Sequence, residues 1–510
     1  MSSRGLRLAT LPVLISLALA GCSLAPKYER PDLPVPDQYP DSAAVNNTGP
    51  DSASVVSPQA QSSSDLGWSE FFTDPRLKSL ISLALANNRD MRIAVERVQE
   101  ARAQYGIAAS DRLPTIGAGA NAQMTGNPEN LRANAEADSV TRYYQAGVGM
   151  TAFELDFFGR VRNLSEAAFQ QYLATGQARR TVHINLVAQV AEAYFRLRTT
   201  QQLNTLMQST QQSRRNTLDL VQARYDGGVA SALDLNQARA QFDTVRADLI
   251  AIERAEAQAR NALTLLLGTP IPDGLPTAAV FGKDQVLAAI PVGLPSDLLE
   301  RRPDIMGAEN SLLAANANIG AAKAAFFPNI SITGLLGFAS PQLGGLFGSS
   351  QHFWQFSPQL TVPIFSGGVA GNLDLAKARN NIAVAQYEKT IQTAFREVAD
   401  SLAGEATYSG QIEALRALEA SAQETLRLAK LRYETGIDSF LQVQTAEVDL
   451  YTVQQNFLQI GMDSLLNRVE LYKALGGGWL RDSASGAGSV TNGTETGTVE
   501  GVDTAGTDTQ

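Results

Sequence analysis

The sequence predicts a mainly α-helical protein with a smaller set of β-strands, and three observations predict this class. First, no proline occurs between Gly159 and Pro270, and Ala, Leu, Gln, Arg and Glu dominate there, so helices much longer than those of globular domains are favoured. Second, four shorter stretches alternate between apolar and polar residues, as strands do. Third, the whole pattern occurs twice within 510 residues, which indicates an internal duplication.

The chain begins with an export signal. Two arginines precede a short apolar run that ends in Leu19-Ala20-Gly21-Cys22, and this run is too short to span a membrane as a helix. Residues 1–21 are therefore predicted to be a signal peptide. Leu-Ala-Gly-Cys resembles the bacterial lipoprotein box, in which the cysteine is acylated and becomes the mature N-terminus. The alternative is that Cys22, the chain's single cysteine, is an unused thiol. Ser23 in place of Asp after such a cysteine implies delivery to a Gram-negative outer membrane.

Two segments that flank the core are expected to lack regular structure. Residues 22–67 are rich in Pro, Ser, Asp and Gln. They have little apolar surface to bury, so we expect an extended, acylated tether. Residues 481–510 contain mainly Gly, Ser, Thr and acidic residues, with no proline or aromatic residue. We expect that tail to be disordered.

The first repeat predicts a helical region, two strands and two long helices. Residues 68–112 place apolar side chains three and four positions apart, as amphipathic helices do. Strands are expected at about 115–124 and 143–157, joined by a polar loop. The stretch from about 163 to 223 would form one helix roughly 90 Å long, with the narrow apolar seam of a coiled coil. A second long helix runs back from Ser231 to Leu267.

Constant spacings reveal the second repeat. Pro114 and Pro328 are 214 residues apart, whereas Tyr225 and Tyr433 are 208 apart, so the second copy has a shorter loop between its strands. The same spacing across two helices and a turn is improbable by chance. The helical regions are therefore expected at 68–112, 158–325 and 367–480, and the strand regions at 113–157 and 326–366.

Alternation is clearest in the strands of the second copy. Trp354, Phe356 and Leu360 share one strand face, opposite polar residues such as Gln355. Such alternation over about ten residues is typical of transmembrane barrel strands, although a half-buried strand of a soluble sandwich would alternate too. Four strands cannot enclose a polar lumen, and open edges are not tolerated in lipid. Either the sheet is soluble or several copies share one barrel. Pro358 in mid-strand removes one ladder hydrogen bond.

The sequence shows no catalytic or metal-binding constellation. His183 and His352 are the only histidines, and no phosphate-binding GxxxxGK[ST] loop occurs. Glu154 and Asp156 fit a strand-to-helix junction better than an acid pair, because carboxylates suit the N-terminal end of a helix. A net charge of −10 argues against nucleic acid as a partner. We therefore expect neither an enzyme nor a cofactor.

Two glycine turns join the long helices into hairpins. Gly228 and Gly436 can adopt the left-handed conformation that ends a helix without a Cβ clash. The spacing of a capping box follows each turn, in Ser231 with Asp234 and in Ser439 with Gln442.

These features resemble the TolC-like outer-membrane factors of tripartite efflux pumps and, among them, the acylated OprM-type proteins. The resemblance covers residues 19–480. Besides the lipoprotein box, it is carried by Trp68-Ser69-Glu70-Phe71-Phe72-Thr73-Asp74-Pro75, Asn87-Asn88-Arg89-Asp90, Phe153-Glu154-Leu155-Asp156-Phe157-Phe158-Gly159-Arg160, Leu298-Leu299-Glu300-Arg301-Arg302-Pro303-Asp304-Ile305, Ala324-Ala325-Phe326-Phe327-Pro328, Ala385-Gln386-Tyr387-Glu388-Lys389 and Leu471-Tyr472-Lys473-Ala474-Leu475-Gly476-Gly477-Gly478-Trp479.

The resemblance implies a homotrimer anchored in outer-membrane lipid. Each chain would give four strands to a twelve-stranded barrel and its long helices to a periplasmic α-barrel with an equatorial region. The implied function is passive: a conduit that receives drugs and solvents from an inner-membrane, proton-driven RND transporter through a periplasmic adaptor. Two alternatives stay open. One is an adaptor lipoprotein of such a pump, with one hairpin and no barrel strands, and the other is a lipid-tethered periplasmic enzyme.

The resemblance also places a periplasmic gate at the two turns. Tyr433 resembles the family's gate tyrosine, Asp234 resembles the acid that it hydrogen-bonds on the neighbouring hairpin, and Leu441 resembles an apolar ring residue. Asp234 could instead only cap its helix, and the tyrosines could only pack between helices. Thr445 stands where the family frequently has an acid, so one ring of charge would be missing here. The other residues expected at the gate are Arg432, Tyr225, Asp226 and Leu233.

Overall fold

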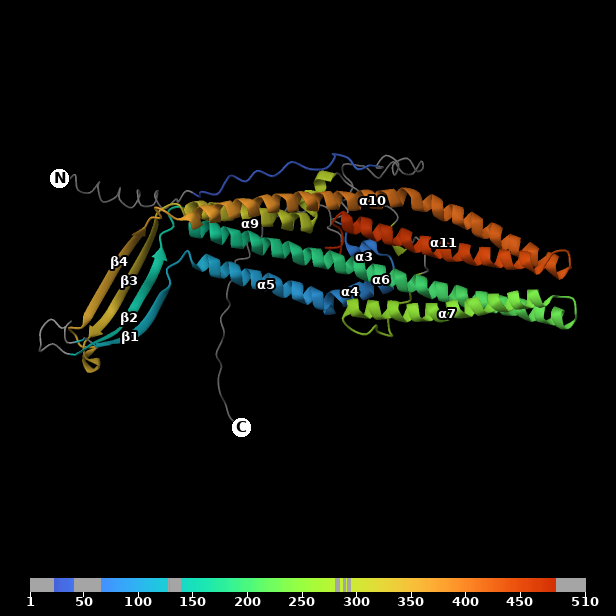
Figure 1. Ribbon diagram of the computed structural model, residues 1–510, viewed down its shortest axis with the longest axis horizontal. Helices are drawn as coiled ribbons and strands as arrows, with labels where there is room; N and C mark the ends of the chain where they lie inside the picture. The colour runs from blue at the N-terminus through green and yellow to red at the C-terminus, as the bar shows by residue number, and fades with distance from the viewer. Residues whose placement is uncertain are drawn as a thin grey trace, which may run out of the picture.

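The molecule is long and narrow, with a sheet at one end and helices along the rest (Figure 1). No helix among the residues described below combines the length and apolarity needed to cross a bilayer. The predicted signal peptide, Cys22, part of the tether and the tail beyond Asp482 lie outside the described residues. The computed structural model describes residues 23–40, 66–126, 128, 139–279, 285–287, 290 and 295–482.

The first repeat opens with short helices whose starts are capped by side chains. Asp74 accepts the backbone N–H of Arg76, and Asn88 accepts that of Met91, as N-cap residues do. Its elements are α3 (Trp68–Phe71), α4 (Pro75–Asn87), α5 (Arg89–Ser110), β1 (Ile116–Gly126), β2 (Val140–Glu154), α6 (Arg160–Asp226) and α7 (Ala232–Leu267).

The second repeat has corresponding elements in the same order, which confirms the predicted duplication. The helices α5 and α9 each have 22 residues, α6 and α10 have 67 and 68, and α7 and α11 have 36 and 35. Its elements are η4 (Pro295–Asp297), α8 (Leu298–Arg301), α9 (Pro303–Ala324), β3 (Asn329–Ser340), η5 (Leu343–Gly345), β4 (His352–Thr361), α10 (Gly367–Glu434) and α11 (Phe440–Ala474).

The four strands form one antiparallel sheet in the order β1-β2-β3-β4. Pro358 pairs with Ile332 on the edge strand β4, and an edge is where a missing backbone N–H is tolerated. Both faces of β1 are exposed, as are Trp354 and Phe356 of β4. The sheet of one chain therefore has little hydrophobic core of its own and leaves two edges for further pairing.

Carboxylates form the junction between the sheet and α6, as predicted. Asp156 Oδ2 accepts the backbone N–H of Arg162 at 2.7 Å, and Glu154 accepts two hydrogen bonds from Arg160. These bonds hold the start of α6 near the end of β2. The strand accordingly ends at Glu154, three residues earlier than the predicted end at Phe157.

The main hydrophobic core lies at mid-length, where α3 and α4 pack among the long helices. Phe71 of α3 stacks on Tyr472 of α11 with ring centroids 4.0 Å apart. The Tyr194 hydroxyl of α6 donates to Asp74 Oδ2 at 2.7 Å. Because large buried aromatic rings dominate such packing, this core fixes the base from which the hairpins extend.

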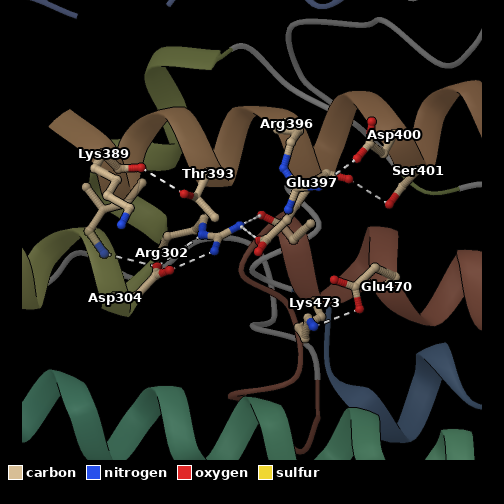
Figure 2. Close-up of polar contacts among 12 residues, drawn as sticks. Arg302, Asp304, Lys389, Thr393, Arg396, Glu397, Asp400, Ser401, Glu470 and Lys473 are labelled. Atoms are coloured by element: carbon tan, nitrogen blue, oxygen red, sulfur yellow. Dashed lines mark hydrogen bonds and ion pairs between the residues drawn. The ribbon is translucent and has the colours of Figure 1, made fainter. Parts of the chain in front are cut away.

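A buried arginine ties the second repeat together near this level (Figure 2). Arg302 donates to both carboxylate oxygens of Asp304 and, at 2.8 Å, to Glu397 of α10. It also donates to the Ala474 carbonyl at the end of α11. Three helices are thus joined through one guanidinium, and breaking such a buried ion pair typically costs about 3–5 kcal/mol.

Residues 23–40 of the predicted tether run as an extended strap along α9 and α10 (Figure 1). Tyr28 and Arg30 both hydrogen-bond to Glu309 of α9. Tyr39 is buried and stacks on Phe395 of α10 at 5.1 Å. The described part of this segment is therefore docked on the helices.

Candidate functional site

The two predicted turns lie together at the end of the molecule remote from the sheet (Figure 1). Gly228 has a φ of 73° and Gly436 a φ of 76°, so both adopt the predicted left-handed conformation. In each turn a backbone N–H donates at 2.9 Å to the carbonyl of an arginine near the helix end, Arg224 in one and Arg432 in the other. The two turns are thus closed by equivalent hydrogen bonds.

The helices after the two turns begin differently. The capping box at Ser231 is confirmed: its hydroxyl accepts the Asp234 N–H at 3.1 Å, and its own N–H donates to Asp234 Oδ2 at 3.0 Å. The capping box predicted for Ser439 and Gln442 is wrong, because the Ser439 side chain makes no capping bond. An ion pair reinforces this turn instead, between Arg432 Nε and Asp438 Oδ2 at 2.5 Å. It raises the pKa of the arginine and lowers that of the aspartate.

An apolar cluster joins the two hairpins of the chain behind the turns. Tyr433 is only 6% exposed, and its ring lies 5.5 Å from that of Phe440. The Arg224 guanidinium lies 4.7 Å from the centre of the same ring, within cation–π range. Arg224 also donates to the Tyr433 carbonyl at 3.3 Å. The members of the cluster are Val221, Leu235, Ala238, Ala429, Tyr433, Phe440, Val443 and Ala446.

The predicted contact between Tyr433 and Asp234 is not made within one chain. The Tyr433 hydroxyl is buried and has no hydrogen-bond partner among the described residues. Burial raises its pKa, Arg224 opposes that shift, and the negative charge of Asp234 adds to it without a hydrogen bond. Both hydrogen bonds recorded for the Asp234 carboxylate come from Ser231. In a single protomer, therefore, Tyr433 packs between helices and Asp234 caps its own helix.

The remaining predicted gate residues lie on the surface of the tip. Leu233 is 65% exposed and Leu441 is 53% exposed, although both are apolar. The Thr445 hydroxyl donates to the Leu441 carbonyl at 3.0 Å, so it is satisfied by its own helix. Tyr225 is exposed, and Asp226 accepts a hydrogen bond from Gln222. The tip of the protomer thus presents uncharged side chains from both turns beside the charged Asp226 and the Arg432–Asp438 ion pair.

The sequence reasoning missed a buried charge just behind the tip. Glu447 of α11 is 6% exposed and lies four residues from each of the buried residues Val443 and Tyr451. A carboxylate on the apolar face of a helix signals a buried partner, since charge is not buried alone. Its partners are Lys430 of α10 and Thr217 of α6.

Neither histidine belongs to the tip. His183 packs edge-on against Trp479 at 5.0 Å, and His352 lies 4.6 Å from Phe338 in the sheet region. Across the part of the chain that the structure describes, no three His, Cys, Asp or Glu residues are grouped as a metal site would require.

Comparison with known proteins places the chain in a family. A family model described as "Outer membrane efflux protein" matches residues 80–269 and 294–477. A probable efflux pump outer membrane protein of Pseudomonas putida, TtgC, is 44% identical over 472 residues, which cover 91% of this chain and 96% of the relative. The cation efflux system protein CusC of Escherichia coli is 42% identical over 471 residues, covering 92% and 98%.

Solved structures resemble this chain over a similar share of its length. The open state of the MtrE outer membrane channel of Neisseria gonorrhoeae has a TM-score of 0.81 and 37% identity, covering 91% of this chain and all of that one. A membrane protein from Pseudomonas aeruginosa has a TM-score of 0.80 and 40% identity, covering 89% of this chain and all of that one. The chain therefore belongs to the outer membrane efflux protein family, in agreement with the resemblance seen in its sequence.

Proposed function

We propose that this chain is the outer-membrane channel of a tripartite efflux pump, a passive conduit without catalytic activity. The observation that carries the proposal is the division of one chain between two helical hairpins at one end and a sheet with two unpaired edges at the other. An adaptor would have one hairpin and no barrel strands, so that alternative is disfavoured. A tethered enzyme is disfavoured by the family to which the chain belongs.

Assembly of several copies follows from the sheet, and the family resemblance implies that there are three. Four strands are too few to close a barrel around a polar lumen, and open strand edges are not tolerated in lipid. Three copies would join β1 of one protomer to β4 of the next and give twelve strands, a size known for such barrels. In such a barrel the exposed side chains of Trp354, Phe356 and Leu360 would contact lipid.

The position of the strap fits acylation at Cys22. The Ser23 hydroxyl donates to Asn163 Oδ1 at 2.9 Å, and Asn163 lies in the first turn of α6, next to the sheet. Ser23 therefore lies close to the level at which the sheet ends. A lipid on Cys22 could enter the inner leaflet there while the strap stays docked.

The closed end of the conduit is proposed to be the tip. Tyr433 and Asp234 would meet across protomers or upon a small shift of the hairpins, and Leu441 and Leu233 would narrow the passage. A ring of apolar residues restricts passage by size and by dewetting. Because Thr445 carries no charge, this constriction should discriminate weakly between cations and anions. The adaptor and the RND transporter would engage this periplasmic end.

The substrates are proposed to be small drugs and solvents. Relatives at 43–44% identity are named for toluene, solvent or antibiotic efflux, but one at 42% is named for cation efflux. Deleting the gene and measuring accumulation tests this directly. We expect a lipophilic dye and toluene to accumulate more, and a plasmid copy to restore efflux. Unchanged accumulation of both, with only metal cations retained, would reject the assigned substrate class.

A further inference from the structure

Behind the apolar cluster of the tip lies a polar cluster, hereafter the Glu447 cluster, formed by the buried Glu447, Thr217 and Arg214 and the partly exposed Lys430 and Ser213. Lys430 Nζ lies 3.0 Å from Glu447 Oε1 and also donates to Ser213 Oγ at 3.3 Å. The Thr217 hydroxyl donates to the same Glu447 oxygen at 3.0 Å. One carboxylate of α11 is therefore held from α10 and from α6, that is, from both hairpins.

Arg214 extends the cluster to the fourth helix. It is 3% exposed, donates to the Gln241 carbonyl of α7 at 2.9 Å, and lies 5.3 Å from the ring centre of Tyr451. The Tyr451 hydroxyl reaches Asp248 of α7 at 3.3 Å. Burial lowers the pKa of Arg214, and the negative charge of Glu447 opposes that shift. Glu447 thus compensates two cations, one on each hairpin.

The two clusters of the tip respond differently to a relative movement of the hairpins. Apolar contacts are non-directional, so the cluster around Tyr433 could be repacked after a small slide. The Lys430–Glu447 ion pair lies within the second hairpin and would move with it. The bonds that cross between the hairpins are charge-assisted and directional. Thr217 of α6 donates to Glu447, and Lys430 donates to Ser213 of α6. A slide of one helical turn, about 5.4 Å, would break both. The Glu447 cluster therefore favours one register of the hairpins.

We propose that Glu447 is a positioning residue of the gate, which locks the second hairpin against the first in the closed register through Thr217. Lys430, on the same hairpin as Glu447, adds a second bond across to Ser213. This inference rests on the proposed gate at the turns. Thr445 stands where the family frequently has an acid. Glu447 supplies a carboxylate two residues further along α11, about 200° around the helix. The Glu447 charge lies inside the protomer, where salt screens it little.

The test compares Glu447→Gln, Thr217→Val and their combination in planar bilayers, with trimer content checked by native electrophoresis. We expect each single variant to raise the resting conductance by at least about tenfold, because each removes the charge-assisted hydrogen bond that joins the two hairpins in the closed state. The double variant should add little to either single one, since both act through one contact. Thr217→Ser should stay closed.

A matched control removes an exposed ion pair on the same hairpin. Glu424 and Arg427 of α10 pair at 2.7 Å and are both exposed, so Glu424→Gln should leave the conductance unchanged. If Glu447→Gln trimers are less heat-stable yet as closed as wild type while a variant opened at Tyr433 and Asp234 conducts, Glu447 is only structural and the proposal is overturned. If no variant conducts, the channel function itself fails.

Discussion

The carboxylate of Asp234 serves its own helix end, since it accepts both the backbone N–H and the hydroxyl of Ser231. A gate role requires that the same carboxylate also reach Tyr433, whose hydroxyl is buried without a partner among the described residues. These roles are separable by mutation. Removing Ser231 Oγ weakens the cap and keeps the acid, whereas removing Asp234 takes away both.

Replacing Tyr433 by Phe together with Asp234 by Ala should open the resting channel, because both groups of the proposed gate bond are lost. The expected result is increased susceptibility of cells to a hydrophilic antibiotic that is too large for the outer membrane. Ser231→Ala is the control, with a loss of about 0.5–2 kcal/mol of helix stability and no gain in susceptibility. Equal susceptibility in both variants would assign the effect to capping.

The residues at the tip show where prediction from sequence succeeded and where it stopped. Spacing located both turns and the Ser231 capping box, because such local geometry depends on a few adjacent residues. It failed at Ser439, where the acid of the turn pairs with Arg432 and no capping bond forms. It also missed Glu447, because the partners of that carboxylate come from distant parts of the chain.

At the scale of elements, the paired hairpins and the sheet were predictable because their periodicities differ and each occurs twice. The bounds of the long helices differ from the predicted ones by only a few residues. The docking of the strap on α9 and α10 was not predictable from composition, because it depends on isolated side chains such as Tyr39. The contacts at the hairpin bases were not predictable either, because they depend on packing between side chains that are distant in the sequence.

Two left-handed glycines of the first hairpin offer a test of that packing. Gly268 ends α7 with a φ of 68°, and a Cβ there would lie 2.5 Å from the Asn87 carbonyl oxygen, whereas a Cβ on Gly228 would meet nothing. Gly228→Ala should cost about 1–2 kcal/mol from conformation alone. Gly268→Ala should cost about 1–3 kcal/mol more, seen as a lower thermal midpoint of the trimer. Equal midpoints would show that the end of α7 at Gly268 does not pack against the end of α4 at Asn87.

At the scale of the whole molecule, one chain is incomplete at both ends. The sheet has two open edges and little core, and the tip exposes apolar Leu233 and Leu441. The mid-length core, by contrast, is closed by aromatic packing within the chain. A protomer that is well packed at mid-length, but has open sheet edges at one end and exposed apolar residues at the other, is suited to assembly around an axis. In such an assembly the copies would complete one barrel and one constriction.

The conductance of purified trimers in a planar bilayer tests the central claim most directly. Wild-type trimers should insert and show a low resting conductance, because the tip is closed. Trimers with Tyr433→Phe and Asp234→Ala should show long openings of much larger conductance at the same protein content. If neither protein conducts although the trimers are intact and inserted, the chain is not the channel proposed here.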